Sequence, residues 1–561
     1  MLSKSLATKI IYLLLAAILL MGMGRLALLP PFEGYDETAH YSRLEAEAFA
    51  PPNTSTRFIT TDVEDYYSRG PMSPRWMFAR AFNDAYHDAL KSSSAFDLAG
   101  HVKSKERKYS DYETFFASPE KVKEYTQIYR QQAAPDKFNA SETLNWQFQH
   151  PPLYYVVCGK ILRSLTGASL IARLFTLRAV SYLTAFAGFV IGIFATRRHL
   201  ELRNHRNAQD ITVFAAFYPF VMPVWFEEFA RLGNDSLCAL LFAINWALLL
   251  WFLRKPDEKF IWVLLGVVMG LSYLTKMLML PASVGFLVFM LLQKPPKPGV
   301  TARLAPVATA GAIAFVIGYL STMNGGFAGS IELQAWLHGK GYVTGVGIPW
   351  GGIFFNVMNM FTSMIYNFGD MAMWREGLPA IDGIFIALAV ILFRWTAVQP
   401  RDLRREEWLP VYPLALMGGG LLLHAVLGAI AYRAGNVGVT PARYIHVEGP
   451  ALMLIFGGGM ATLLSRKYGR TFTGLLFAAA AAFNVFILIV RLDFFAGCNA
   501  TQEGAARFGN QGACLNFHGL YDRLAVLGSP AFGLPCLALA LLLLVAASIM
   551  AVRRASWEYD M

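Results

Sequence analysis

The sequence predicts an all-α polytopic membrane protein of about 12 transmembrane helices, with a mostly helical extracytoplasmic subdomain after the first helix. Three observations support this fold class. Hydrophobic residues make up 55% of the 561 residues, and charged residues only 16%. The apolar residues gather in runs long enough to cross a bilayer. A single long polar segment follows the first of these runs and greatly exceeds an ordinary connection.

The first transmembrane helix is predicted in residues 1–30. Its apolar run begins near Ile11, after Lys4 and Lys9, and Pro30 and Pro31 stand where a cleavage site would lie. We therefore expect an uncleaved anchor with a cytoplasmic N-terminus. The formal net charge of +11 comes from Lys and Arg residues spread over short loops between apolar runs. This distribution indicates membrane topology and argues against a nucleic-acid partner.

The remaining chain divides into four predicted regions. Residues 31–150 form the extracytoplasmic subdomain, with amphipathic helices around 74–90 and 118–131. Residues 151–323 begin with a short juxtamembrane helix at 153–165 and continue with spans at 168–196, 211–226, 236–253, 260–275, 278–292 and 304–323. Residues 324–378 form an extracytoplasmic loop region. Residues 379–561 contain spans at 379–393, 409–432, 445–464, 471–490 and 529–552, with an outer loop at 493–528. Arginine-rich loops alternate with these spans, so both termini are expected in the cytoplasm.

An acidic stretch, LPPFEGYDETAHYS, directly follows the first span. It places Asp36, Glu37 and His40 at a membrane face, where such side chains are costly unless water, a partner or a ligand compensates them. The alternative is a solvated acidic loop that caps a helix, with Asp36 near the N-cap.

The predicted topology collects many other polar residues on the same outer face. They include His150, Arg231, Asp235, Lys276, Arg375 and Arg443. No Gly-rich nucleotide cradle faces the cytoplasm, so chemistry is expected outside, with a lipid-linked group donor. Lys276, Arg231 and Arg443 suit the phosphate of such a donor, and a carboxylate can activate an acceptor hydroxyl. No His/Cys spacing indicates a metal site, and no cofactor is expected.

Several of these residues also have a purely structural interpretation. Lys276 could reach the headgroups from a helix end, and Arg443 could neutralise a helix C-terminus or bind ordinary phospholipid. Asp235 could be an N-cap, and His150, before two prolines, a turn residue.

Six motifs together resemble the GT-C glycosyltransferases, which include protein O-mannosyltransferases, the lipid A aminoarabinose transferase and bacterial arabinosyltransferases. The motifs are FEGYDETAHY, QHPPLYY, the pair Arg173 and Arg178, RLGNDS, GLSYLTK and TPARY. They extend to about residue 445, in an order and outer location similar to that superfamily.

The resemblance implies an inverting transfer of a sugar from a polyprenyl phosphate to an acceptor hydroxyl. Asp36 would be the general base, and Glu37 a supporting carboxylate. The donor phosphate would lie near His150, Arg231, Lys276, Arg443 and Tyr444, and the substrate near His40, Tyr41, Asp235 and Arg375. The acceptor would be a cell-envelope glycan, a lipid or a protein such as a pilin. The expected location is a bacterial inner membrane, with the active site facing the periplasm.

Two other function classes remain open from the sequence. A transporter or flippase of a lipid-linked anion would also place cations beside a cavity. A non-catalytic subunit for envelope-glycan assembly would use the long outer segment to bind proteins.

The cysteines suggest one disulfide bond. Cys498 and Cys514 share a polar loop predicted to lie outside, whereas the other three cysteines lie in apolar segments. Several glycines between the pair allow the chain reversal that a bridge requires.

Overall fold

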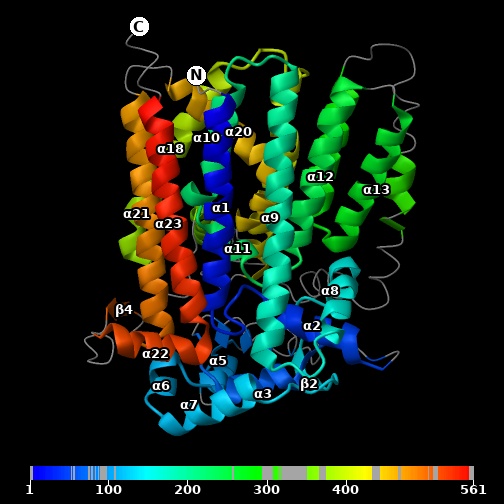
Figure 1. Ribbon diagram of the computed structural model, residues 1–561. Helices are drawn as coiled ribbons and strands as arrows, with labels where there is room; N and C mark the ends of the chain where they lie inside the picture. The colour runs from blue at the N-terminus through cyan, green and yellow to red at the C-terminus, as the bar shows by residue number, and fades with distance from the viewer. Residues whose placement is uncertain are drawn as a thin grey trace.

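A computed structural model describes most of the chain between residues 4 and 554. The longer stretches outside the described residues are 89–97, 294–306, 317–349, 366–373, 433–441, 465–468, 509–515 and 555–561, with shorter gaps elsewhere. The molecule is a bundle of long helices with a smaller lobe at one end (Figure 1). The predicted class, an all-α polytopic membrane protein, is confirmed.

Six helices in the described part of the chain are long and apolar enough to cross a membrane. They are α1 (Lys4–Leu28), α9 (Leu170–Leu202), α12 (Asp235–Arg254), α19 (Val411–Tyr432), α21 (Gly469–Phe495) and α23 (Pro530–Arg554). Further apolar helices accompany them: α10 (Ala208–Val221), α13 (Lys259–Thr275), α14 (Met279–Leu292), α17 (Trp350–Ile365), α18 (Trp374–Ala397) and α20 (Gly449–Leu464). The count of about 12 spans stays a prediction.

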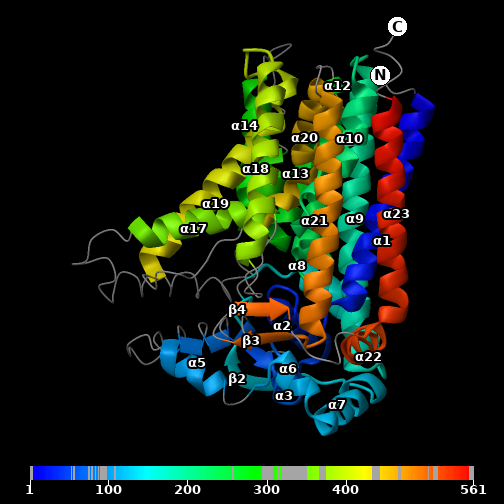
Figure 2. The same ribbon diagram turned by 90° about the vertical axis from the view of Figure 1, so that its left-hand side faces the viewer.

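Small residues bring the bundle helices close together. A Cβ on Gly188 of α9 would lie 2.8 Å from the Cα of Leu240 in α12. A Cβ on Gly24 of α1 would lie 2.9 Å from the carbonyl oxygen of Gly533 in α23. Glycine at these two positions allows the backbones to approach in a way that larger residues would prevent. As a result α1 and α23 run side by side, and α1 starts at the end of the bundle opposite the lobe (Figures 1 and 2).

The predicted single span at 211–226 is wrong, because the structure divides it. Helix α10 ends at Val221, and a separate short helix, α11, covers Val224–Phe229. Pro223 causes the break: a proline disfavours helical geometry in the residue before it, and Met222 has φ −117° and ψ 71°. The break sets the orientation of α11, which carries Glu227 and Glu228.

The lobe is made mainly from residues 31–163, at the foot of the bundle (Figure 2). Its helices are α2 (Glu37–Phe49), α3 (Thr61–Arg69), α5 (Leu98–Glu106), α6 (Tyr112–Phe116), α7 (Pro119–Tyr125) and α8 (Leu153–Arg163), and a π-helical segment, η1, covers Thr126–Gln131. Strands β1 (Phe58–Thr60) and β2 (Ala140–Leu144) pair antiparallel, with Phe58 opposite Leu144. The predicted helix around 74–90 is described only in part.

The lobe has its own aromatic core, separate from the core of the bundle. Phe32 packs edge-on against Tyr41, Tyr66 and Tyr67, with ring centroids 5.0–6.2 Å apart. Such edge-to-face packing adds to the free energy of burial. This core holds the chain that leaves α1 against α2 and α3.

Arginines connect the lobe to the bundle. Arg173 in α9 donates to the carbonyl oxygens of Ala134 and Pro135, each at 3.0 Å. Arg130 donates to the carbonyl oxygens of Ala525, Val526 and Gly528, at the end of α22 (Phe517–Leu527). The strands β3 (Asn499–Gln502) and β4 (Ala505–Phe508) form a second hairpin beside the lobe. The stretch 130–135 of the lobe is thereby fastened both to α9 and to the helix that precedes α23.

The lobe holds two neighbouring carboxyl groups, Glu45 of α2 and Asp62 of α3. Glu45 is fully buried, and Asp62 is partly buried. Burial, followed by the nearby charge of Asp65, raises the pKa of Asp62 to about 6. Burial and the charge of Asp62 raise the pKa of Glu45 well above its usual value. The folded lobe therefore binds protons that the unfolded chain releases in mildly acidic solution.

The lobe should accordingly become less stable as the pH rises. A carboxyl group whose pKa is higher in the folded protein favours folding fully at pH values below its pKa in the unfolded chain. This contribution is lost as the pH rises through its pKa in the folded protein. We expect amide hydrogen exchange in α3, corrected for intrinsic rates, to accelerate between pH 5 and pH 7. Asp62→Asn should flatten this dependence, and an equally steep dependence in that variant would contradict the assignment.

Candidate active site

The residues between α1 and α2 expose one carboxylate and bury the next. Pro30 and Pro31 end the first helix, and Asp36 takes a left-handed conformation, with φ 57° and ψ 13°. Such a conformation is strained for a residue other than glycine and is frequent at functional sites. Asp36 lies at the N-cap position, but its side chain makes no capping hydrogen bond. The predicted alternative, a capping role, is therefore not what the geometry shows.

The Asp36 carboxylate instead contacts the indole of Trp146 and faces the guanidinium of Arg443. Its Oδ1 accepts a 2.9 Å hydrogen bond from Trp146 Nε1, and its Oδ2 lies 3.9 Å from Arg443 Nη2. The side chain keeps 22% of its surface exposed. This carboxylate is therefore held in a defined orientation and remains partly accessible.

Glu37 is fully buried and has no free oxygen. Arg178 of α9 donates from Nε to Oε1 at 2.7 Å and pairs through Nη2 with Oε2. The backbone N–H groups of Leu232 and Gly34 donate to the same carboxylate, at 2.9 and 3.2 Å. Arg178 also donates to the carbonyl oxygens of Leu29 and Pro30. Through these contacts the Glu37–Arg178 pair joins α1, α2, α9 and the loop before α12, so Glu37 is a positioning residue.

Beside this pair, six charged side chains form a sequence of contacts with alternating sign, here called the charge chain. Its members, in order of contact, are Asp36, Arg443, Glu228, Arg231, Asp235 and Lys276. Arg443 Nε lies 2.8 Å from Glu228 Oε2, and Arg231 pairs with Glu228 and, at 3.0 Å, with Asp235. Lys276 Nζ donates to Asp235 Oδ1 at 2.6 Å. All members except Asp36 are buried.

Helix ends and short connecting segments supply these residues. Arg443 and Tyr444 lie in the 3₁₀ segment η3 (Ala442–Glu448), Arg231 lies between α11 and α12, and Lys276 caps α13. Lys276 lies 4.1 Å from the centre of the Tyr444 ring, and Arg443 lies 3.9 Å from that of Tyr35. Aromatic faces stabilise desolvated cations. Lys276 is buried here, so it does not reach to the headgroups.

Asp235 does not have the N-cap role that was its structural alternative, because Asn234 is the N-cap residue of α12. The Asp235 carboxylate pairs with Arg231 and Lys276. It therefore neutralises cations rather than a helix end.

Two histidines lie next to the charge chain. The His40 and His150 rings stack with centroids 6.2 Å apart, and His40 Nδ1 lies 2.9 Å from the Tyr155 hydroxyl oxygen. Burial, followed by the charges of Arg231 and Lys276, lowers the pKa of His40 well below its usual value. Burial and Lys276 do the same to His150. Both imidazoles are therefore neutral at physiological pH and suited to hydrogen bonding with a sugar or hydroxyl group.

Not every predicted residue lies here. The Tyr41 ring is buried in the aromatic core of the lobe, against Phe32. The Arg375 side chain lies outside the described residues, although its backbone is in the first turn of α18. Cys498 is buried and Cys514 lies outside the described residues, so the disulfide bond stays a prediction.

Sequence reasoning missed three contributors. Trp146 orients Asp36, Tyr35 covers Arg443, and Glu228 joins the two arginines. Trp146 stands four residues before His150 of the QHPPLYY motif, so its proximity to a motif residue was the available signal. Glu228 stands three residues before Arg231, outside the RLGNDS motif.

Comparison with known proteins identifies similar solved structures. No protein-family model matches the chain, and no curated protein sequence does. Two structures of ArnT from Cupriavidus metallidurans match, one bound to undecaprenyl phosphate and one in the apo state. They share 16% and 14% identity with this chain, at a TM-score of 0.37 in each case. The alignments cover 72% of this chain and 67% and 68% of the ArnT chains.

The Glu37–Arg178 contact should be essential for folding. Glu37→Gln leaves a buried guanidinium without its counterion, a change that typically costs about 3–5 kcal/mol. We expect a lower midpoint of thermal unfolding, measured by tryptophan fluorescence of the purified protein in detergent. Asp36→Asn is the matched control: asparagine tolerates the left-handed conformation and can still accept from Trp146. A Glu37→Gln variant that unfolds with the wild-type midpoint would show that the pair contributes little.

Proposed function

We propose that the protein is an inverting glycosyltransferase that moves a sugar from a polyprenyl-phosphate donor to an acceptor hydroxyl. One observation carries the proposal: the single accessible carboxylate among Asp36, Glu37, Glu228 and Asp235 lies beside a cluster of buried cations. A general base and a set of phosphate ligands are what this reaction needs. The motifs that resemble GT-C enzymes contain most of these residues.

In the proposed reaction, an Asp36 oxygen accepts the proton of the acceptor hydroxyl. The hydroxyl oxygen forms a bond to the anomeric carbon of the sugar from the face opposite the phosphate. The bond from that carbon to the phosphate oxygen breaks, and the leaving polyprenyl phosphate keeps the electron pair. Trp146 holds the Asp36 carboxylate through Oδ1, so Oδ2 is the oxygen we assign as the base.

In this proposal the charge chain separates the position of the base from the position of the leaving phosphate. Asp36 is at one end of it and Lys276 at the other, so a base and a leaving phosphate do not have to share a position. Arg443, Arg231 and Lys276 would stabilise the negative charge that develops on the leaving phosphate. His150, Tyr444 and His40 would line the same space, with Arg375 as a further substrate contact.

The location of the reaction follows from the predicted topology. Positively charged loops are expected in the cytoplasm, which places the lobe and the charge chain on the periplasmic side of a bacterial inner membrane, with both termini cytoplasmic. A cell-envelope glycan, a lipid or a protein such as a pilin would be the acceptor. In this proposal residues 31–150 are the acceptor-facing subdomain.

Asp36→Asn should abolish transfer while the protein remains folded. The amide retains the shape and the hydrogen bond from Trp146 but cannot take a proton, and loss of a general base costs about 10²–10⁴-fold in rate. Purified protein would be incubated with synthetic polyprenyl-phosphate sugars, and release of polyprenyl phosphate followed by mass spectrometry.

Asp65→Asn is the matched control, because Asp65 is a lobe carboxylate that pairs with Arg69 away from the charge chain. It should transfer at the wild-type rate. Transfer by Asp36→Asn at that rate would exclude Asp36 as the base.

Lys276→Ala and Arg443→Ala should each raise KM for the lipid donor. Each removes one charge-assisted contact to the phosphate, and the carboxylate left behind retains Arg231 as a partner. Lys276→Arg should preserve part of the donor affinity, since charge is the property required. If KM is unchanged in both alanine variants, the phosphate lies elsewhere, with Arg231 and Arg375 as the residues to test.

A further inference from the structure

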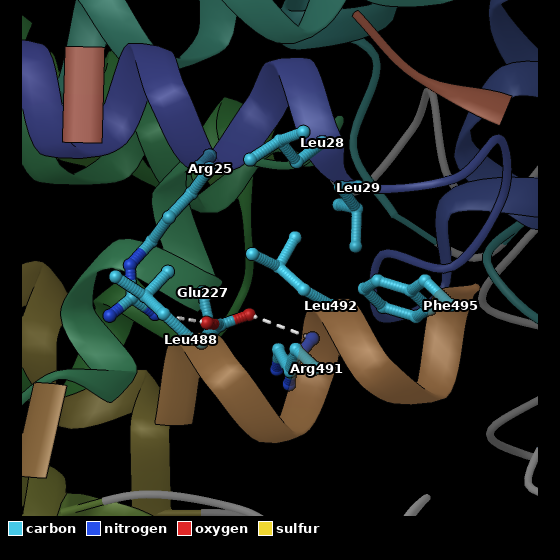
Figure 3. A pocket seen from close by; sticks show the side chains of 9 residues that line it. Arg25, Leu28, Leu29, Glu227, Leu488, Arg491, Leu492 and Phe495 are labelled. Atoms are coloured by element: carbon cyan, nitrogen blue, oxygen red, sulfur yellow. Dashed lines mark hydrogen bonds and ion pairs between the residues drawn. The ribbon is translucent and has the colours of Figure 1, made fainter. Parts of the chain in front are cut away.

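Two adjacent glutamates of α11 have separate sets of cations. Glu227 lies between Arg25 of α1 and Arg491 of α21, and the three side chains point toward one another beside a cavity of about 30 Å³ (Figure 3). Glu228 lies between Arg443 and Arg231 of the charge chain. The two carboxylates have the same chemistry, and Glu227 is slightly more exposed than Glu228, so their main difference is the set of cations that each contacts.

The charge chain is neutral without a ligand. It contains three carboxylates, Asp36, Glu228 and Asp235, and three cations, Arg443, Arg231 and Lys276. A phosphodiester adds one negative charge, and an uncompensated charge is costly at a buried site. The arriving phosphate therefore needs either a displaced carboxylate or a proton.

Of the two buried carboxylates of the charge chain, Glu228 has the contacts that are easier to replace, because it accepts one side-chain hydrogen bond, from Arg231. Asp235 accepts hydrogen bonds from both Lys276 and Arg231. The 2.8 Å contact of Glu228 Oε2 with Arg443 Nε is an ion pair only, because neither atom makes a hydrogen bond. Arg443 is buried, so this N–H is a desolvated donor that a phosphate oxygen could satisfy.

We propose that Glu228 is an internal competitor of the donor phosphate: its carboxylate neutralises Arg443 and Arg231 until a lipid phosphate takes over these guanidinium groups, and Glu228 then takes up a proton. This inference rests on the proposed function and adds a regulatory step to the same site. The proton comes from solvent and no covalent bond changes. The charged groups that act on Glu228 from the surrounding segments are Arg231, Asp235, Arg443 and Lys276. Arg443 in turn faces Asp36 and Tyr444.

The test measures binding of a prenyl phosphodiester. Farnesyl methyl phosphate carries one fixed negative charge near neutral pH, so any proton uptake comes from the protein. Its Kd would be measured with the purified full-length protein in detergent. Farnesol, which lacks the phosphate, would report the contribution of the prenyl group alone. Glu228→Gln should bind about tenfold more tightly than the wild type, since the competing charge is gone. Glu228→Asp, which restores the charge, should bind like the wild type.

Glu227→Gln is the matched control, with the same substitution one residue earlier. It weakens the contacts with Arg25 and Arg491 and leaves the charge chain unaltered, so its Kd should equal that of the wild type. Equal or weaker binding by a folded Glu228→Gln variant would overturn the inference while leaving the proposed function intact. Absence of wild-type binding above the farnesol level would overturn both.

Proton uptake gives a second readout that does not depend on the variant folding. Calorimetry of the wild type in two buffers of different ionisation enthalpy should show uptake of about one proton per bound phosphodiester. Because the complex binds more protons than the free protein, affinity should fall as the pH rises. A wild-type titration with tight binding and no proton uptake would contradict the inference.

Discussion

The buried ion pair between Glu37 and Arg178 is the interaction on which the rest of the site depends. It connects the end of α1, the start of α2, the body of α9 and the loop before α12. A fully buried carboxylate is tolerated only when its oxygens are satisfied, and here two N–H groups of the backbone complete the contacts that Arg178 begins. The position of Asp36 follows, since it precedes Glu37 and has little freedom once Glu37 is held.

A break in one helix makes the charge chain possible. Pro223 ends α10 and lets α11 turn, so that Glu228 meets Arg443 and Arg231 while Glu227 meets Arg25 and Arg491. A continuous helix would continue the span and would not supply this turn. The cost of burying so many charges is met by opposite charges and by the aromatic rings of Tyr35 and Tyr444.

The lobe is attached rigidly enough to act as one wall of this site. Its aromatic core surrounds Phe32, and Arg173 and Arg130 connect it to the bundle through main-chain carbonyl groups. Trp146 reaches Asp36 from this lobe, and His150 begins the short segment that leads into α8. The proposed base therefore lies in the turn between α1 and α2 and is oriented by an indole from a later part of the lobe.

The sequence by itself determined the fold class, the lobe after the first helix and most of the polar residues that meet at its junction with the bundle. Hydropathy, proline positions and runs of basic residues are local properties, so they can be read along the chain. Only the tertiary structure decided the partners of these residues. Asp36 and Glu37 are neighbours of similar chemistry, yet a left-handed turn exposes the first, and Arg178, 141 positions away, buries the second. Glu228 and Arg443 are still farther apart in sequence, and nothing local distinguishes Glu228 from Glu227. Pairing of buried charges depends on which helices pack together, and that depends on contacts spread over the whole chain.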